Sequence, residues 1–117
     1  MKKFVVGILF FVVLLTVVTA VSAQSGPQIT IVNNTGYTVW HVYISSNASG
    51  SWGSDRLGRD QVLRNGQSLR VNLPHPIDVV NRYDIRLVDS DGDSYTKMNV
   101  RVSANSRIEF YLSDIDL

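Results

Sequence analysis

The fold class is decided by residues 28–45, QITIVNNTGYTVWHVYIS. At its start, Ile29 and Ile31 alternate with their neighbours at the period of two that is typical of a β-strand. The tetrapeptide at 33–36, Asn-Asn-Thr-Gly, contains residues that tolerate positive φ and predicts a turn. Residues 37–45 are rich in β-branched and aromatic side chains and predict a second strand. We therefore expect residues 28–45 to form a β-hairpin.

The second strand of this stretch is largely apolar on both faces if its side chains alternate strictly. We expect Trp40 to be the core tryptophan of a sandwich, because it is in phase with two aliphatic residues. The alternative is a strand that carries an exposed aromatic row. The two faces are Trp40, Val42 and Ile44 on one side, and Tyr37, Val39, His41 and Tyr43 on the other.

Four further segments alternate apolar with polar residues, at 69–73, 83–88, 97–102 and 108–113. Turn-forming residues separate them, and no segment has a convincing helical period. Short strands joined by turns predict an all-β chain, an antiparallel β-sandwich of the Ig-like or a similar type with about six to seven strands. The apolar phase of these strands predicts a core that includes Ile85, Leu87, Val100, Ile108 and Phe110.

The first 23 residues have the pattern of a secretory signal peptide. Two lysines at positions 2 and 3 precede an apolar run at 4–18, and Val21-Ser22-Ala23 places small residues before a cleavage site at Gln24. An uncleaved membrane anchor is the alternative, but no Lys or Arg follows the apolar run until Arg56. We expect a single mature domain, residues 24–117, that is periplasmic or secreted and meets a membrane only during export.

The composition excludes several classes of function. Of the 11 Lys and Arg residues, two lie in the predicted leader, so nine basic residues remain against ten acidic ones. A nucleic-acid partner is not expected, because such binding needs a basic excess on one face. The chain has no cysteine, so disulfides, thiol catalysis and cysteine zinc sites are excluded.

Two resemblances rest on particular residues. The run at 29–37, followed by Ser45, Trp52-Gly53, Asp55 and Leu57, resembles small exported bacterial β-sandwich domains of unknown function. Three short matches, Val-Asn-Asn at 32–34, Tyr-Thr-Val-Trp at 37–40 and the strand entry at 63–68, are similar to the opening strands of thaumatin-like proteins. The chain lacks that family's cysteines, so the second resemblance implies a sandwich opening and no antifungal or glucan activity.

Aromatic residues supply the first candidate site. Trp52 stands among serines and glycines in the irregular stretch 46–61, where its ring either pins the loop or contacts a ligand. Exposed rings on a β-surface suit stacking on sugars or anchoring a protein partner. The predicted ligand-binding residues are Trp52, Tyr43 and Asp55.

Asp89, Asp91 and Asp93, at alternate positions around Gly92, supply the second candidate. Clustered carboxylates suit calcium, although the EF-hand spacing is absent and an Asp-Gly hairpin explains the same residues. Calcium is the one cofactor that the sequence indicates.

The sequence therefore predicts an exported, non-enzymatic binding or structural module of the cell envelope, with an unidentified protein or glycan partner. A calcium-dependent binding domain is the first alternative and a small hydrolase the second. The hydrolase alternative has few candidate catalytic residues, because Glu109 is the only glutamate and His41 and His75 are the only histidines.

Overall fold

A computed structural model describes residues 26–46 and 50–117. The leader predicted for residues 1–23 and its cleavage before Gln24 lie outside the described residues and stay predictions. In the part of the chain that is described, no helix has the length and apolar character needed to cross a membrane.

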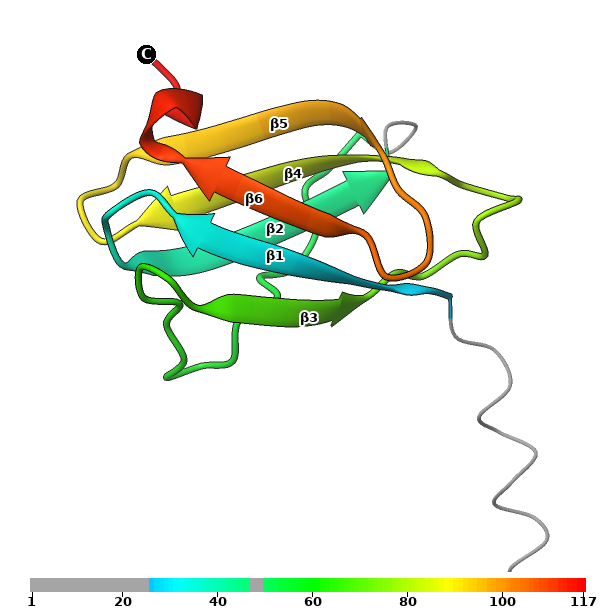
Figure 1. Cartoon of the computed structure of the whole chain (residues 1–117), viewed down its shortest axis with the longest axis horizontal. Helices are drawn as coiled ribbons and strands as arrows, with labels where there is room; N and C mark the ends of the chain where they lie inside the picture. The colour runs from blue at the N-terminus through cyan, green and yellow to red at the C-terminus, as the bar shows by residue number, and fades with distance from the viewer. Residues whose placement is uncertain (1–25, 47–49) are drawn as a thin grey trace, which may run out of the picture.

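Six strands form two three-stranded sheets that pack face to face (Figure 1). One sheet has the order β3-β1-β6 and the other the order β2-β4-β5, and this arrangement confirms the predicted β-sandwich. The elements are β1 (Gln28–Asn34), β2 (Val39–Ser46), β3 (Ser68–Asn72), β4 (Arg82–Asp89), β5 (Ser94–Arg101), β6 (Arg107–Tyr111) and the short 3₁₀ helix η2 (Leu112–Asp114).

The predicted hairpin at residues 28–45 is wrong, because β1 and β2 belong to different sheets. Asn33 explains the difference: its buried side-chain amide donates to the carbonyls of Tyr37 and Leu63, both at 2.8 Å, and its Oδ1 accepts from the backbone N–H of Thr35. The amide thus takes the Tyr37 carbonyl, which lies within the expected hairpin, and ties the corner to Leu63, which lies outside it. Residues 33–36 therefore carry the chain from one sheet to the other.

The β1 strand also departs from the expected antiparallel pattern. It pairs antiparallel with β3 but parallel with β6, with Ile31 opposite Ile108. The pairings of β2 with β4 and of β4 with β5 are antiparallel. A parallel pair needs a long connection, and the whole second sheet supplies it between β1 and β6.

The core lies between the two sheets, and four of its predicted members are confirmed. Ile85, Leu87, Ile108 and Phe110 are buried, whereas Val100 is partly buried and packs against their cluster. Each of the buried four lies on the inward phase of a regularly alternating strand segment. The sequence pattern is therefore reliable where the ladder is uninterrupted.

A β-bulge in β2 overturns the prediction for Trp40. Val39 pairs with Asp89 and His41 with Val88, so Trp40 is an extra residue without a partner opposite it. The bulge lets Val39 and Val42 both face the core, and Trp40 is left 50% exposed. Trp40 is therefore not the core tryptophan of this sandwich.

A second bulge, in β5, interrupts the alternation of Met98 with Val100. Tyr83 pairs with Val100 and Ile85 with Lys97, so both Met98 and Asn99 lie opposite Asp84. Asn99 adopts a positive φ of 56°. The extra residue shifts the phase of the strand and leaves Met98 63% exposed.

Candidate functional site

The bulges change the outer face of the β2–β4–β5 sheet. Trp40 and Met98 are exposed there, and His41, Tyr43 and Arg86 lie between them on the outward phase of β2 and β4. Trp52 reaches the same surface from the loop and stacks on Arg86. We call this surface the aromatic face: Trp40, His41, Tyr43, Trp52, Arg86 and Met98.

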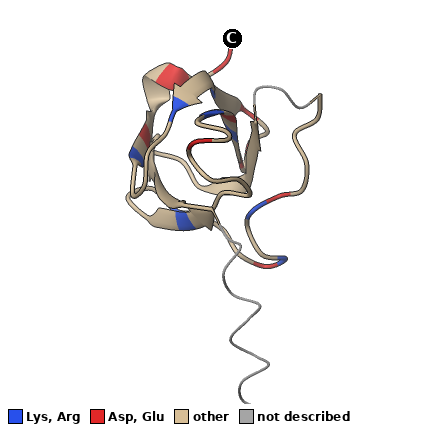
Figure 2. Cartoon of the chain, turned by 90° about the vertical axis from the view of Figure 1, so that its right-hand side faces the viewer, with Lys and Arg blue, Asp and Glu red and all other residues tan. Residues whose placement is uncertain are grey.

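The segment that carries Trp52 runs along the β2 edge of this sheet, outside the two layers (Figure 2). Asp55 fastens it to the sheet. Its Oδ1 accepts hydrogen bonds from the backbone N–H groups of Val42 (2.9 Å) and Leu57 (3.0 Å), and His41 Nδ1 donates to its Oδ2 at 2.7 Å. Asp55 thus holds the loop and orients the imidazole, and its predicted contact with a ligand stays a prediction.

Electrostatics fit this fastening role for Asp55. Burial raises the pKa of its carboxyl group, but the hydrogen bonds from Val42, Leu57 and His41 outweigh burial and lower the pKa from 3.8. The carboxylate is therefore ionised at neutral pH, as an acceptor of three hydrogen bonds must be.

One hollow on the aromatic face lies beside Trp40. His41, which stacks on Tyr43 with ring centroids 6.1 Å apart, forms part of its wall. We call it the Trp40 hollow; its volume is about 280 Å³ and it is lined by Trp40, His41, Arg59, Asp60, Gln61 and Val62.

The position of Trp52 is set by a chain of polar contacts. The Arg86 guanidinium lies 4.7 Å from the centroid of the indole ring. Arg86 Nε donates to Thr96 Oγ1 at 2.9 Å, and Thr96 Oγ1 donates to Asp116 Oδ2 at 2.6 Å. The ring therefore rests on a cation that β5 and the C-terminal segment hold in place.

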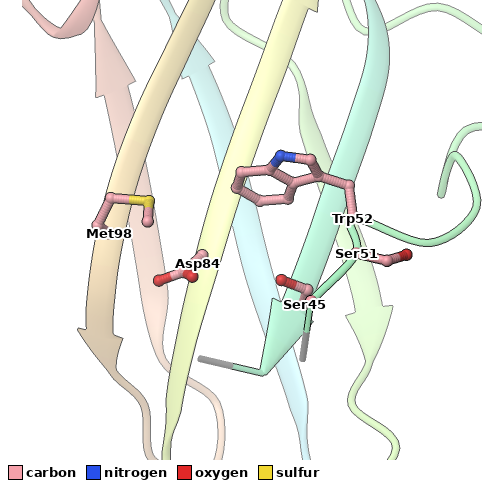
Figure 3. A pocket seen from close by; sticks show the side chains of 6 residues that line it. Ser45, Ser51, Trp52, Asp84 and Met98 are labelled. Atoms are coloured by element: carbon pink, nitrogen blue, oxygen red, sulfur yellow. The ribbon is translucent and has the colours of Figure 1, made fainter. Parts of the chain in front are cut away.

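The second hollow lies beside Trp52 and has a volume of about 170 Å³. Figure 3 shows the indole reaching over β4 toward Met98 of β5, with Asp84 and Ser45 next to it. Asp84 Oδ1 accepts a hydrogen bond of 2.7 Å from the Asn99 backbone N–H, so the β5 bulge also fixes this carboxylate. We call this the Trp52 hollow; Gly50 and Ser51 complete its described lining.

The predicted calcium residues lie at the turn between β4 and β5. One carboxylate oxygen from each of Asp89, Asp91 and Asp93 lies within 4.8 Å of the others. Asp89 is buried, however, and its Oδ1 accepts from the backbone N–H groups of Asp91 (2.9 Å) and Asp93 (3.0 Å). Its Oδ2 accepts from the Tyr95 hydroxyl at 2.8 Å. Asp89 therefore stabilises the hairpin with both of its oxygens.

Sequence reasoning located only part of the aromatic face. It singled out Trp52 and Tyr43, which lie on that face, but it missed Arg86 and Met98 and placed Trp40 in the core. A local signal for the β5 bulge, and so for Met98, is Asn99, because asparagine tolerates positive φ and is depleted in regular strands.

Comparisons with known proteins show the fold and nothing finer. No family model matches the chain, and no curated protein matches it. The NMR structure of a protein from Eubacterium rectale is similar, with a TM-score of 0.58 and 14% sequence identity, covering 81% of this chain and 87% of that chain. The resemblances expected from residues 29–37 and 63–68 therefore stay predictions, and the structural neighbour supports a shared β-sandwich architecture.

Proposed function

We propose that the protein is an exported, non-enzymatic binding module whose ligand-contacting surface is the aromatic face. One observation carries the proposal: both tryptophans of the chain lie on this single face, although neither is needed to fill the core. Apolar rings left in water lose the stabilisation that burial provides, and bulges that re-aim side chains are concentrated at functional sites. A ligand that covers the rings would recover that stabilisation.

The rigidity of the face supports the same proposal. Asp55 and Arg86 hold the loop and the Trp52 ring against the sheet before any ligand arrives. Side chains that are already ordered lose less conformational entropy on binding. The aromatic face is thus prepared for contact at low entropic cost.

Hydrolysis has weaker support. Glu109, the only glutamate, lies on the opposite sheet and accepts hydrogen bonds from Tyr111 (2.6 Å), Arg107 (3.3 Å) and Asn34 (3.1 Å). These contacts, led by the Tyr111 hydroxyl, lower the pKa of its carboxyl group. A general acid needs a raised pKa, so we do not assign a catalytic role to Glu109.

A sedimentation assay with the cell-envelope fraction of the producing organism tests the binding proposal. The mature protein is expected to sediment with the fraction, and the Trp40→Ala/Trp52→Ala double variant is expected to stay in the supernatant. Tyr111→Ala is the matched control, because Tyr111 lies on the other sheet and is 48% exposed, close to the 50% of Trp40. Equal sedimentation of all three proteins would contradict the proposal.

Calcium-dependent binding is a second candidate, favoured by the three carboxylates within 4.8 Å at the β4–β5 turn. Calcium bound only to the folded state would raise the Tm, and magnesium would raise it less, because magnesium dehydrates reluctantly. Asp91→Asn should abolish the rise and leave the turn intact, because asparagine suits the same turn. An identical Tm with calcium and with a chelator would remove this candidate and leave the aromatic face unaffected.

A further inference from the structure

We propose that the ligand of the aromatic face is a neutral carbohydrate chain, with one sugar ring in the Trp40 hollow and another in the Trp52 hollow. This inference rests on the proposed function and names the class of ligand for the same surface.

The sizes of the two hollows favour single rings. Pockets for drug-sized molecules start at about 300 Å³, whereas these hollows measure about 280 and 170 Å³. Each is open and shallow, so it suits a flat group presented by a longer chain. A sugar ring of a polysaccharide is such a group.

The chemistry of the two hollows is the same, although their residues come from different elements. The Trp40 hollow combines an indole with the carboxylate of Asp60, and the Trp52 hollow combines an indole with the carboxylate of Asp84. An indole face packs against the C–H face of a sugar ring, while a carboxylate accepts hydrogen bonds from the hydroxyls at its rim. Few other ligands present an apolar face and a ring of donors at this scale.

Fixed hydrogen-bonding groups strengthen the argument for a polar ligand. The Asn99 N–H donates to Asp84 Oδ1, and the Gly58 N–H donates to Gln61 Oε1 at 2.9 Å. The Gln61 Nε2 group takes no part in this second contact. Orientation of such groups in advance favours a ligand with hydroxyls in defined positions. It adds little to the binding of a purely apolar partner.

The mixed charges on the face favour a neutral, hydroxylated ligand over the other main classes of partner. Arg59 and Asp60 line one hollow together, and Arg86 lies beneath Trp52 near the carboxylate of Asp84. This mixture does not attract a polyanion, which needs a basic excess. The centre of a protein interface is depleted of charged residues, because charges buried there lose their hydration. A hydroxylated neutral chain can instead hydrogen-bond to both signs of charge.

The spacing of the hollows implies a chain of several sugar units. Trp40 lines one hollow and Ser45 the other, five positions further along β2. At about 3.3 Å per residue, these positions are roughly 16 Å apart. Once one ring of a chain is bound in one hollow, another ring of the same chain is present at a high effective concentration at the other hollow. Long oligosaccharides should therefore bind more tightly than disaccharides.

Differential destruction of the envelope fraction tests the ligand class. Periodate cleaves vicinal diols and so opens sugar rings that carry two free neighbouring hydroxyls, as in cellulose, xylan and starch but not chitin, whereas a broad-specificity protease destroys protein partners. We expect Trp-dependent sedimentation of the protein to disappear after periodate and to persist after proteolysis. Loss after proteolysis with resistance to periodate would overturn the carbohydrate inference and leave the binding proposal standing. Sedimentation that never depended on the tryptophans would overturn the binding proposal itself.

Titration with defined neutral oligosaccharides, from two to eight units of cellulose, chitin, xylan and starch, provides the direct measurement. Both tryptophans of the chain lie in the proposed subsites, so intrinsic tryptophan fluorescence reports on these alone. We expect saturable changes that strengthen with chain length, and a loss on the order of tenfold in affinity for long chains in Trp40→Ala or Trp52→Ala. Affinity independent of chain length, or unchanged in both variants, would overturn the two-subsite inference.

Discussion

The outer faces of the two sheets differ sharply, although they cover the same core. On the β3–β1–β6 sheet, polar side chains bond to one another across the strands: Gln28 Nε2 donates to Asn72 Oδ1 at 2.8 Å, and Asn34 Nδ2 donates to Glu109 Oε1 at 3.1 Å. On the β2–β4–β5 sheet, two bulges expose Trp40 and Met98. We call the outer surface of the β3–β1–β6 sheet the polar face: Gln28, Arg70, Asn72, Arg107, Glu109 and Tyr111.

The comparison shows how a strand ladder decides what a surface can do. Regular pairing brings the polar residues of the polar face close together, either directly opposite, as Gln28 and Asn72, or one step along the ladder, as Asn34 and Glu109, so that they hydrogen-bond to one another. A bulge removes one residue from the ladder and turns it outward. The aromatic face therefore exposes Trp40 and Met98, the apolar groups that the proposed ligand would cover.

The largest expected effect on stability comes from the core that lies beneath both faces. Phe110 in β6 is fully buried between the sheets, and Lys97 Nζ lies 5.4 Å from its ring centroid. Phe110→Ala should lower the free energy of unfolding by about 3–5 kcal/mol, because it leaves a cavity in a packed core. Urea denaturation measures the change, and a midpoint close to that of the parent protein would show that the sheets do not share this core.

A smaller loss is expected from the fastening of the loop on the aromatic face. Asp55→Ala removes the acceptor of the Val42 and Leu57 N–H groups and should cost about 1–3 kcal/mol in unfolding free energy. Asp60→Ala, in an exposed position of the same loop, is the stability control. Equal denaturation midpoints for the two variants would contradict the fastening role.

Acid should weaken the same contact. Because the pKa of Asp55 is lowered from 3.8 on folding, its contribution is present above that pH and is lost as the pH falls through the lowered pKa. The parent protein should therefore lose more stability than Asp55→Asn between pH 5 and pH 2. Parallel pH–stability curves for the two proteins would contradict this assignment.

Alkali should act on the turn between β4 and β5. Burial, followed by the hydrogen bond to Asp89 and its charge, raises the pKa of Tyr95 from 10.0 to about 12. The unfolded chain then releases its proton first, so stability is full below pH 10 and falls as the pH rises toward 12. Denaturation at several alkaline pH values should show a shallower fall in Tyr95→Phe, and an equally steep fall would contradict this role.

The smallest expected effect separates the two readings of Trp40. An exposed side chain on a bulge contributes little to the core, so Trp40→Ala should change the free energy of unfolding by about 0.5 kcal/mol or less. Tyr111→Ala, on the polar face, should change it by a similar amount. A loss as large as that of Phe110→Ala would restore the core position that strict alternation predicts for Trp40.

Sequence periodicity was sufficient to predict the residues that pack between the two sheets. It was insufficient to predict which residues form the aromatic face. Ile85, Leu87, Ile108 and Phe110 follow from alternation, because each lies in a regular stretch of ladder. Trp40 could not be placed, since a bulge depends on the register with β4 rather than on β2 alone. A one-residue shift in phase reverses every inference about which side faces water.

The corner at residues 33–36 shows the same limit. Asn-Asn-Thr-Gly has the composition of a hairpin turn, but the destination of the chain depends on the carbonyl of Leu63, 30 residues further along. Likewise, the hydrogen bond from the Val42 N–H to Asp55 could not be predicted from the composition of the loop, because Val42 lies in β2. Local composition identifies such residues as candidates, but their structural roles can be assigned only from tertiary contacts.

Hydroxyl-radical footprinting with mass spectrometry tests most directly the claim that the two outer faces have different roles. The protein is oxidised briefly, free and bound to the envelope fraction, and protection is read at exposed oxidisable side chains on both faces. The account predicts protection of Trp40 and Met98 in the bound state, with unchanged oxidation of Tyr111 and Leu112, which are also exposed. Protection of Tyr111 and Leu112 with unchanged oxidation of Trp40 and Met98 would contradict it.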